Sequence, residues 1–123
     1  MATTTIPGEQ LAAITREMVR IKSQDYGKGA TEAKTYQCDN FVFCVLKDAL
    51  TTVERNLLEH GDAALVREVR LRFQHHTGNA LPAVVERITG RRVLAYESQV
   101  LFDPDYVVEI FALDDDAPAA DRS

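Results

Sequence analysis

The sequence predicts an α+β domain, a two-layer sandwich in which a four-stranded antiparallel sheet carries its helices on one face. Three observations support this fold class. Apolar residues recur at helical spacing near the start of the chain, strand-like segments come in two adjacent pairs, and one of these segments is apolar without interruption. Strands grouped as hairpins favour an antiparallel sheet, so the expected element order is α-β-β-α-α-β-β.

The first half of the chain reads as one helix followed by a β-hairpin. Residues 8–24 carry an apolar stripe at three- and four-residue spacing. This stripe consists of Leu11, Ile14, Met18 and Ile21. Asp39-Asn40 predicts a two-residue turn between strands at 32–38 and 41–46. The second strand, FVFCVL, is apolar on both faces, which is typical of a central strand buried on both sides.

Helices and a second hairpin form the rest of the expected fold. The segment TTVE at 51–54 has capping-box spacing and predicts the start of a short helix. After Asp62 a longer helical pattern runs to Gly90, interrupted at residues 75–79, with Pro82 acting as a helix start or as a kink. The side chains expected to face the core from these helices are Val53, Leu57, Leu58, Leu65, Val66, Val69, Phe73, Leu81, Val84, Val85 and Ile88. Residues 91–102 and 106–113 read as the last two strands.

The bulk composition suits a single soluble domain. A chain of 123 residues can bury one core without staples. We expect a flexible start at 1–7, one domain at 8–113 and an acidic disordered tail at 114–123. The net charge of −5 argues against a nucleic-acid binder and against docking onto an anionic membrane. No apolar run approaches the roughly 20 residues of a membrane span and no signal peptide is evident, so we expect a cytoplasmic protein.

The loop after the first helix is the candidate ligand site. Its members are Gly27, Lys28, Gly29, Thr31, Glu32 and Lys34. A nucleotide P-loop needs glycines five apart before Lys-Ser/Thr, whereas here the glycines are two apart and the loop leads into a strand. A turn in which one glycine supplies a positive φ is therefore the favoured interpretation. A small-anion or nucleotide sensor that uses the loop amides and both lysines is the alternative.

No motif points to catalysis, a metal or a cofactor. The adjacent His75 and His76 diverge on a helix and lack metal-ligand spacing, and neither Cys38 nor Cys44 has a base nearby in the sequence. We therefore expect a protein that is not an enzyme and holds no cofactor. One local basic patch on the long helix consists of Arg87, Arg91 and Arg92, together with Arg67, Arg70 and Arg72. It is either a solvated surface or a partner-docking surface.

Four stretches of this sequence resemble the MpsC-like family. They are YGKGATEAKTY at 26–36, LTTVERNLLEHGD at 50–62, ERITGRRV at 86–93 and SQVLFDPDYVVEIFAL at 98–113. The family is named after a component associated with a bacterial sodium-translocating, membrane-potential-generating system that is linked to cation or bicarbonate uptake. The resemblance implies a non-enzymatic accessory or regulatory protein that reaches the inner face of the membrane through a transporter or other protein partner. A homodimer is a further expectation, formed through an exposed edge strand.

Overall fold

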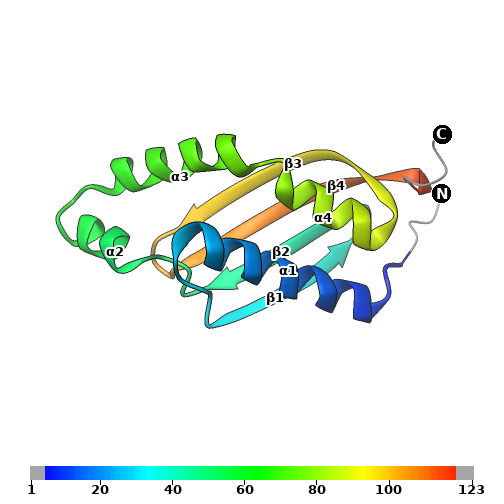
Figure 1. Cartoon of the computed structure of the whole chain (residues 1–123), viewed down its shortest axis with the longest axis horizontal. Helices are drawn as coiled ribbons and strands as arrows, with labels where there is room; N and C mark the ends of the chain where they lie inside the picture. Colours follow the sequence, from blue (N-terminus) through cyan, green and yellow to red (C-terminus); the bar gives the residue numbers. More distant parts are fainter. Residues whose placement is uncertain (1–4, 119–123) are drawn as a thin grey trace.

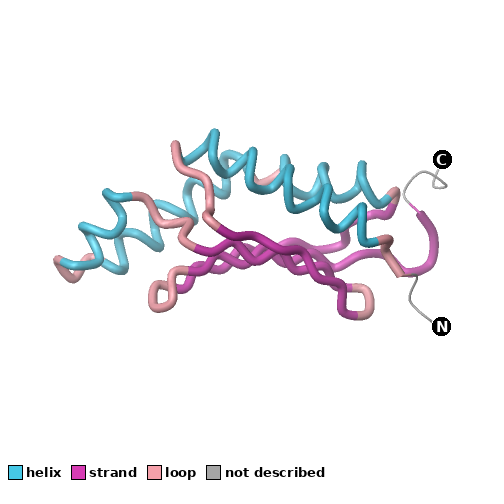
Figure 2. The backbone as a smooth tube through the Cα atoms, turned by 90° about the horizontal axis from the view of Figure 1, so that it is seen from below, coloured by secondary structure: helices cyan, strands magenta, loops and turns pink. Residues whose placement is uncertain are grey.

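The computed structural model describes residues 5–118, which form four helices and one four-stranded antiparallel sheet (Figure 1). The elements are α1 (Gly8–Tyr26), β1 (Glu32–Cys38), β2 (Phe41–Lys47), α2 (Thr52–Glu59), α3 (Ala63–Thr77), α4 (Ala80–Thr89), β3 (Arg91–Leu101) and β4 (Tyr106–Pro118). The strand order is β1-β2-β4-β3, with every neighbouring pair antiparallel. The helices lie on one side of the sheet (Figure 2). The predicted fold class and the central place of β2 are confirmed.

The helical segment after Asp62 differs from the expectation. The expected order counts one helix there, with an interruption at residues 75–79, but α3 ends at Thr77 and a separate helix, α4, begins at Ala80. Pro82 accounts for part of this break, because a proline has no amide hydrogen to donate to the carbonyl of the residue four positions earlier. The expected order therefore lacks one helix.

The last strand is longer than expected. It was predicted to end at residue 113, but β4 continues through the first residues of the expected acidic tail to Pro118. The guanidinium of Arg91 donates to the carbonyl oxygen of Asp114 at 2.9 and 3.3 Å, which holds this extension against the start of β3. Residues 119–123 of the expected tail, and residues 1–4 of the expected flexible start, lie outside the described residues.

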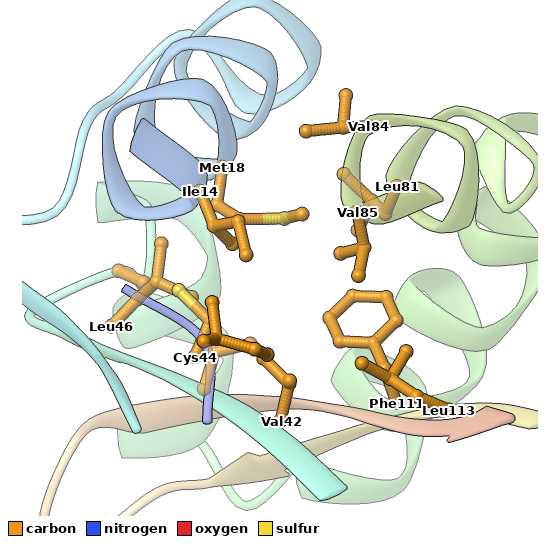
Figure 3. Close-up of a cluster of buried hydrophobic side chains, with 13 residues drawn as sticks. Ile14, Met18, Val42, Cys44, Leu46, Leu81, Val84, Val85, Phe111 and Leu113 are labelled. Carbon is orange, nitrogen blue, oxygen red and sulfur yellow. The ribbon is translucent and has the colours of Figure 1, made fainter. Parts of the chain in front are cut away.

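The hydrophobic core lies between the sheet and the pair α1 and α4 (Figures 1 and 3). Its labelled members in Figure 3 are Ile14, Met18, Val42, Cys44, Leu46, Leu81, Val84, Val85, Phe111 and Leu113. Each is fully or almost fully removed from water, and such burial is worth about 1.5–3 kcal/mol for a large side chain. Alternate residues of β2 and β4 supply the sheet side of the core, because successive strand side chains point to opposite faces.

The pair α2 and α3 buries only part of the stripe that the sequence predicts, because Val66 is 1% exposed but three other members are not buried. Val53 is 67% exposed, Leu65 is 44% exposed and Val69 is 48% exposed. The buried side chains include two charged ones instead, Glu54 and Arg70, at 8% and 7% exposure. Arg70 donates to both carboxylate oxygens of Glu54, at 2.6 and 2.7 Å, so neither charge is buried alone. A charged pair that neutralises itself therefore joins α2 to α3.

Candidate functional site: the open face of the sheet

The side of the sheet that faces away from the helices is the most unusual surface of this domain. We call it the open face. Its members are Glu32, Lys34, Tyr36, Cys38, Phe41, Phe43, Val45, Lys47, Ala95, Glu97, Gln99, Leu101, Tyr106, Val108, Ile110 and Ala112. Within the described part of the chain no helix lies on this side (Figure 2). Antiparallel sheets can leave one face in water, but that face is then normally polar.

The centre of the open face is apolar. Two adjacent rows cross it from strand to strand: Tyr36, Phe43, Ile110 and Glu97 in the first, and Lys34, Val45, Val108 and Gln99 in the second. Tyr36, Phe41 and Leu101 are 40–46% exposed. The rings of Phe41 and Phe43 stack with centroids 6.0 Å apart.

The size of this face makes it a candidate interaction surface. Four strands about 4.8 Å apart and seven residues of about 3.4 Å each give a footprint of about 450 Å². Patches of a few hundred Å² are among the largest apolar surfaces that monomeric proteins expose, and they often mark binding sites.

The open face carries few charged side chains, and the unpaired ones lie on its two edge strands. Lys47 and Glu32 pair with each other at 3.7 Å. Lys34, on edge strand β1, lies over the Tyr36 ring at 5.1 Å, and Glu97 lies on the opposite edge strand, β3. Among the described residues neither Lys34 nor Glu97 has an ion-pair partner. The face is therefore apolar in its middle, with one unpaired positive and one unpaired negative side chain on opposite edges.

The loop predicted as a ligand site is tied to the segment after β2. Gly27 has φ 71° and ends α1, and its N–H donates to the carbonyl oxygen of Ser23 at 2.9 Å. Lys28 donates to the carbonyl oxygens of Asp48 and Leu50. Thr31 donates its hydroxyl to the Asp48 carboxylate at 2.6 Å. These contacts make the loop a brace between two connections of the fold.

The six predicted loop residues do not gather around one point. Lys28 contacts the segment after β2, whereas Lys34 and Glu32 lie within β1 on the open face. Gly29 lies against the side chain of Ser23. Anion binding at this loop stays a prediction.

The three arginines predicted as a docking patch lie in different environments. Arg87 is exposed on α4 and pairs with Glu17 of α1 at 3.5 Å. Arg91 is only 6% exposed, because its guanidinium holds the extension of β4 described above. Arg92 is exposed. The structure therefore offers the guanidinium groups of Arg87 and Arg92, but not that of Arg91, to a partner, and docking there stays a prediction.

A cleft of about 380 Å³ lies between α1, α3 and the β3 side of the sheet. Its basic lining residues are Lys22, Arg67, Arg70 and His75. Most of this charge is already compensated within the fold. Lys22 lies 2.7 Å from Glu109, Arg70 is held by Glu54, and Arg67 stacks over the Phe102 ring at 4.3 Å.

Sequence reasoning missed the buried carboxylate that pairs with Lys22, one of the residues that line this cleft. Glu109 has no exposed surface and lies on β4 between inward-facing Val107 and Phe111. Its Oε1 faces the Lys22 ammonium, and its Oε2 accepts from the Tyr96 hydroxyl at 3.2 Å. A glutamate at an inward position of an apolar strand is the signal that could have revealed it.

Two tyrosines and one thiol beneath the helices are held in their neutral forms. Burial, with the neighbouring Glu109 carboxylate, raises the pKa of Tyr96 well above its usual range. Burial also raises the pKa of Tyr26 to about 12 and that of the Cys44 thiol to about 11. Cys44 is therefore a protonated thiol at neutral pH and a poor nucleophile.

Residues 5–118 contain neither a metal-binding cluster nor a membrane-spanning helix. No group of three or more His, Cys, Asp or Glu side chains is placed to hold a metal ion there. Within the same residues no helix has both the length and the apolar composition needed to cross a membrane.

Comparison with known proteins identifies the family. Neither the curated proteins nor the solved structures contain a match to this sequence. A family model described as "Na+-translocating membrane potential-generating system (MpsC)" matches residues 8–115, from the start of α1 into β4. Because that match spans nearly all of the described elements, the chain belongs to the MpsC family.

Proposed function

We propose that this chain is a non-enzymatic accessory or regulatory domain of a bacterial sodium-translocating, membrane-potential-generating system. The family match over residues 8–115 carries the proposal, because the family is described by that system. In this role the chain works at the cytoplasmic side of the membrane, bound to a protein partner, and influences cation or bicarbonate uptake without forming the ion path.

The geometry supports a role in binding rather than in chemistry. The polar groups beneath the helices pair with one another: Lys22 with Glu109, and Arg70 with Glu54. Such pairs have a structural role, because each buried charge lies next to its opposite. The open face has an apolar centre and no helix over it, as expected of an interaction surface.

Co-purification from membranes tests this proposal. The chain, tagged at one end, is expressed at native level in cells that encode it, and membranes are solubilised in a gentle detergent. We expect a sodium-translocating membrane protein to be retained in a fixed ratio to the tagged chain, and absent from a control with the same tag on an unrelated acidic domain of similar size. Recovery of no membrane protein beyond that control would contradict the proposal.

A physiological measurement separates association from function. Cells that lack the chain should show a lower membrane potential in sodium medium than in potassium medium of equal ionic strength, and the chain supplied in trans should restore it. An unchanged potential in both media would contradict a role in the system, even if co-purification succeeds.

A further inference from the structure

The open face includes one side of an apolar strand that the helices leave uncovered. The run FVFCVL is apolar on both faces, as is typical of a strand covered on both sides. The helices cover only the face that holds Val42, Cys44 and Leu46, while Phe41 on the other face is 40% exposed. We propose that the open face packs against the same face of a second copy of this chain, with a two-fold axis parallel to the strands. This assembly goes beyond the proposed function and does not depend on it.

A second copy fits because the open face is complementary to itself. In a two-fold dimer the same patch meets itself, so every charge must find its opposite on the same patch. The open face carries Lys34 on one edge strand and Glu97 on the other, in adjacent rows of the sheet. Neither has an ion-pair partner among the described residues, and both are exposed.

The axis parallel to the strands places β1 of one copy over β3 of the other. Each row of residues across the sheet then faces the same row of the second copy. Lys34 then lies over Gln99 of the second copy, one row, or about 7 Å, from Glu97 of that copy. Packed sheets are about 10 Å apart and cross at about 30°, which extended lysine and glutamate side chains can bridge. The symmetry makes this pair twice, once at each edge of the interface.

The same axis also matches side-chain volumes. It places β2 of one copy over β4 of the other, so Phe41 lies over Ala112 of the second copy. Phe43 lies over Ile110 and Val45 over Val108 in the middle of the interface. Large residues opposite small ones interdigitate without a void, as in a packed core.

The other aligned arrangement is electrostatically unfavourable. A two-fold axis across the strands would lay each strand over its own counterpart and reverse the rows. Lys34 would then lie one row from Lys34 of the second copy, and Glu97 one row from Glu97. Like charges at that separation oppose association, so charge selects the axis parallel to the strands.

Charge exchange measured by sedimentation equilibrium tests both the face and the axis. Lys34→Glu and Glu97→Lys each place like charges together twice, so we expect each to raise the dimer dissociation constant at least tenfold. The double variant restores both pairs with exchanged signs, and we expect its constant to return to within about threefold of wild type. Arg72→Glu, an equal charge change on the exposed face of α3, is the matched control and should leave the constant unchanged.

The alternative results each overturn the proposal. A chain that stays monomeric at all concentrations would refute the dimer and leave the open face to a different protein. A dimer whose dissociation constant is unchanged by both single variants would place the interface elsewhere. A double variant that dissociates as readily as the single variants would refute the axis. Because the two side chains are exposed on the sheet, circular dichroism should show wild-type folding for every variant. Failure here leaves membrane co-purification unaffected, so the two proposals fail separately.

Discussion

The buried pair Arg70–Glu54 should be a main source of stability for the α2–α3 region, and Glu54→Gln tests this. The substitution keeps the size of the side chain and an oxygen that can accept from the Thr51 backbone N–H, now bonded to Glu54 at 2.8 Å. It removes the carboxylate charge that two bonds of 2.6 and 2.7 Å join to the guanidinium. The result is a guanidinium at 7% exposure with no opposite charge next to it.

The magnitude follows from the cost of an uncompensated buried charge. Breaking such a pair by removing one partner costs about 3–5 kcal/mol. Two contacts soften the loss, because Arg70 also donates to the Ala49 carbonyl at 3.2 Å and lies 4.4 Å from the centre of the Tyr26 ring. We therefore expect Glu54→Gln to lower the free energy of unfolding by about 3 kcal/mol.

Urea denaturation followed by circular dichroism measures this loss. Glu68→Gln is the matched control, because Glu68 pairs with Arg72 at 3.0 Å on an exposed helix surface and should change stability by less than about 0.5 kcal/mol. The double variant Glu54→Gln, Arg70→Met removes both charges and should lose less than the two single variants together. A loss for Glu54→Gln no larger than that of the control would refute the reasoning.

Three further predictions follow from the same contacts. Burial opposes the charge of Glu54, but hydrogen bonds from Arg70 and the Thr51 backbone outweigh burial and lower the pKa of Glu54 below 4.5. The stability that this carboxylate contributes above pH 4.5 should therefore be lost as the pH falls further. Glu54→Gln should make stability depend less on pH in acid, and equal acid denaturation curves for variant and wild type would contradict this. At a concentration low enough to keep the chain monomeric, a thiol reagent at pH 8 should modify exposed Cys38 in the native chain, and Cys44 only after unfolding. Rapid reaction of both thiols in the native chain would refute the burial of Cys44. Lys28→Ala should lower the melting temperature without any ligand, because two carbonyl bonds are lost, and an unchanged melting temperature would deny the loop its role as a brace.

Much of the fold was predictable because local patterns and tertiary packing agree there. The stripe of α1 places Ile14 and Met18 in the core at helical spacing, and the turn at Asp39-Asn40 joins β1 to β2. Thr51 forms the predicted capping box with Glu54, its hydroxyl accepting from the Glu54 N–H at 3.1 Å. In each case neighbours in sequence suffice to specify the structure.

The errors arise where partners distant in sequence decide the outcome. Aliphatic spacing on α3 predicted that Leu65 and Val69 face inward, but both are exposed. The inward side of the helix carries Arg70 instead, which bonds to Glu54, sixteen positions away. The candidate site was missed for a similar reason. Hydrophobicity shows that both faces of β2 are apolar, yet only the arrangement of the helices shows that one of these faces remains uncovered.

Small-angle X-ray scattering of the purified chain tests most directly whether the open face is an interface. A compact chain of 123 residues should have a radius of gyration of about 14 Å, and a compact pair about 18 Å. We predict twice the mass of 13.7 kDa, a radius near the larger value and a maximum dimension close to that of one copy, because face-to-face packing adds thickness rather than length. A single-copy mass at every concentration, or a doubled mass with a much longer particle from edge-to-edge strand pairing, would contradict the account.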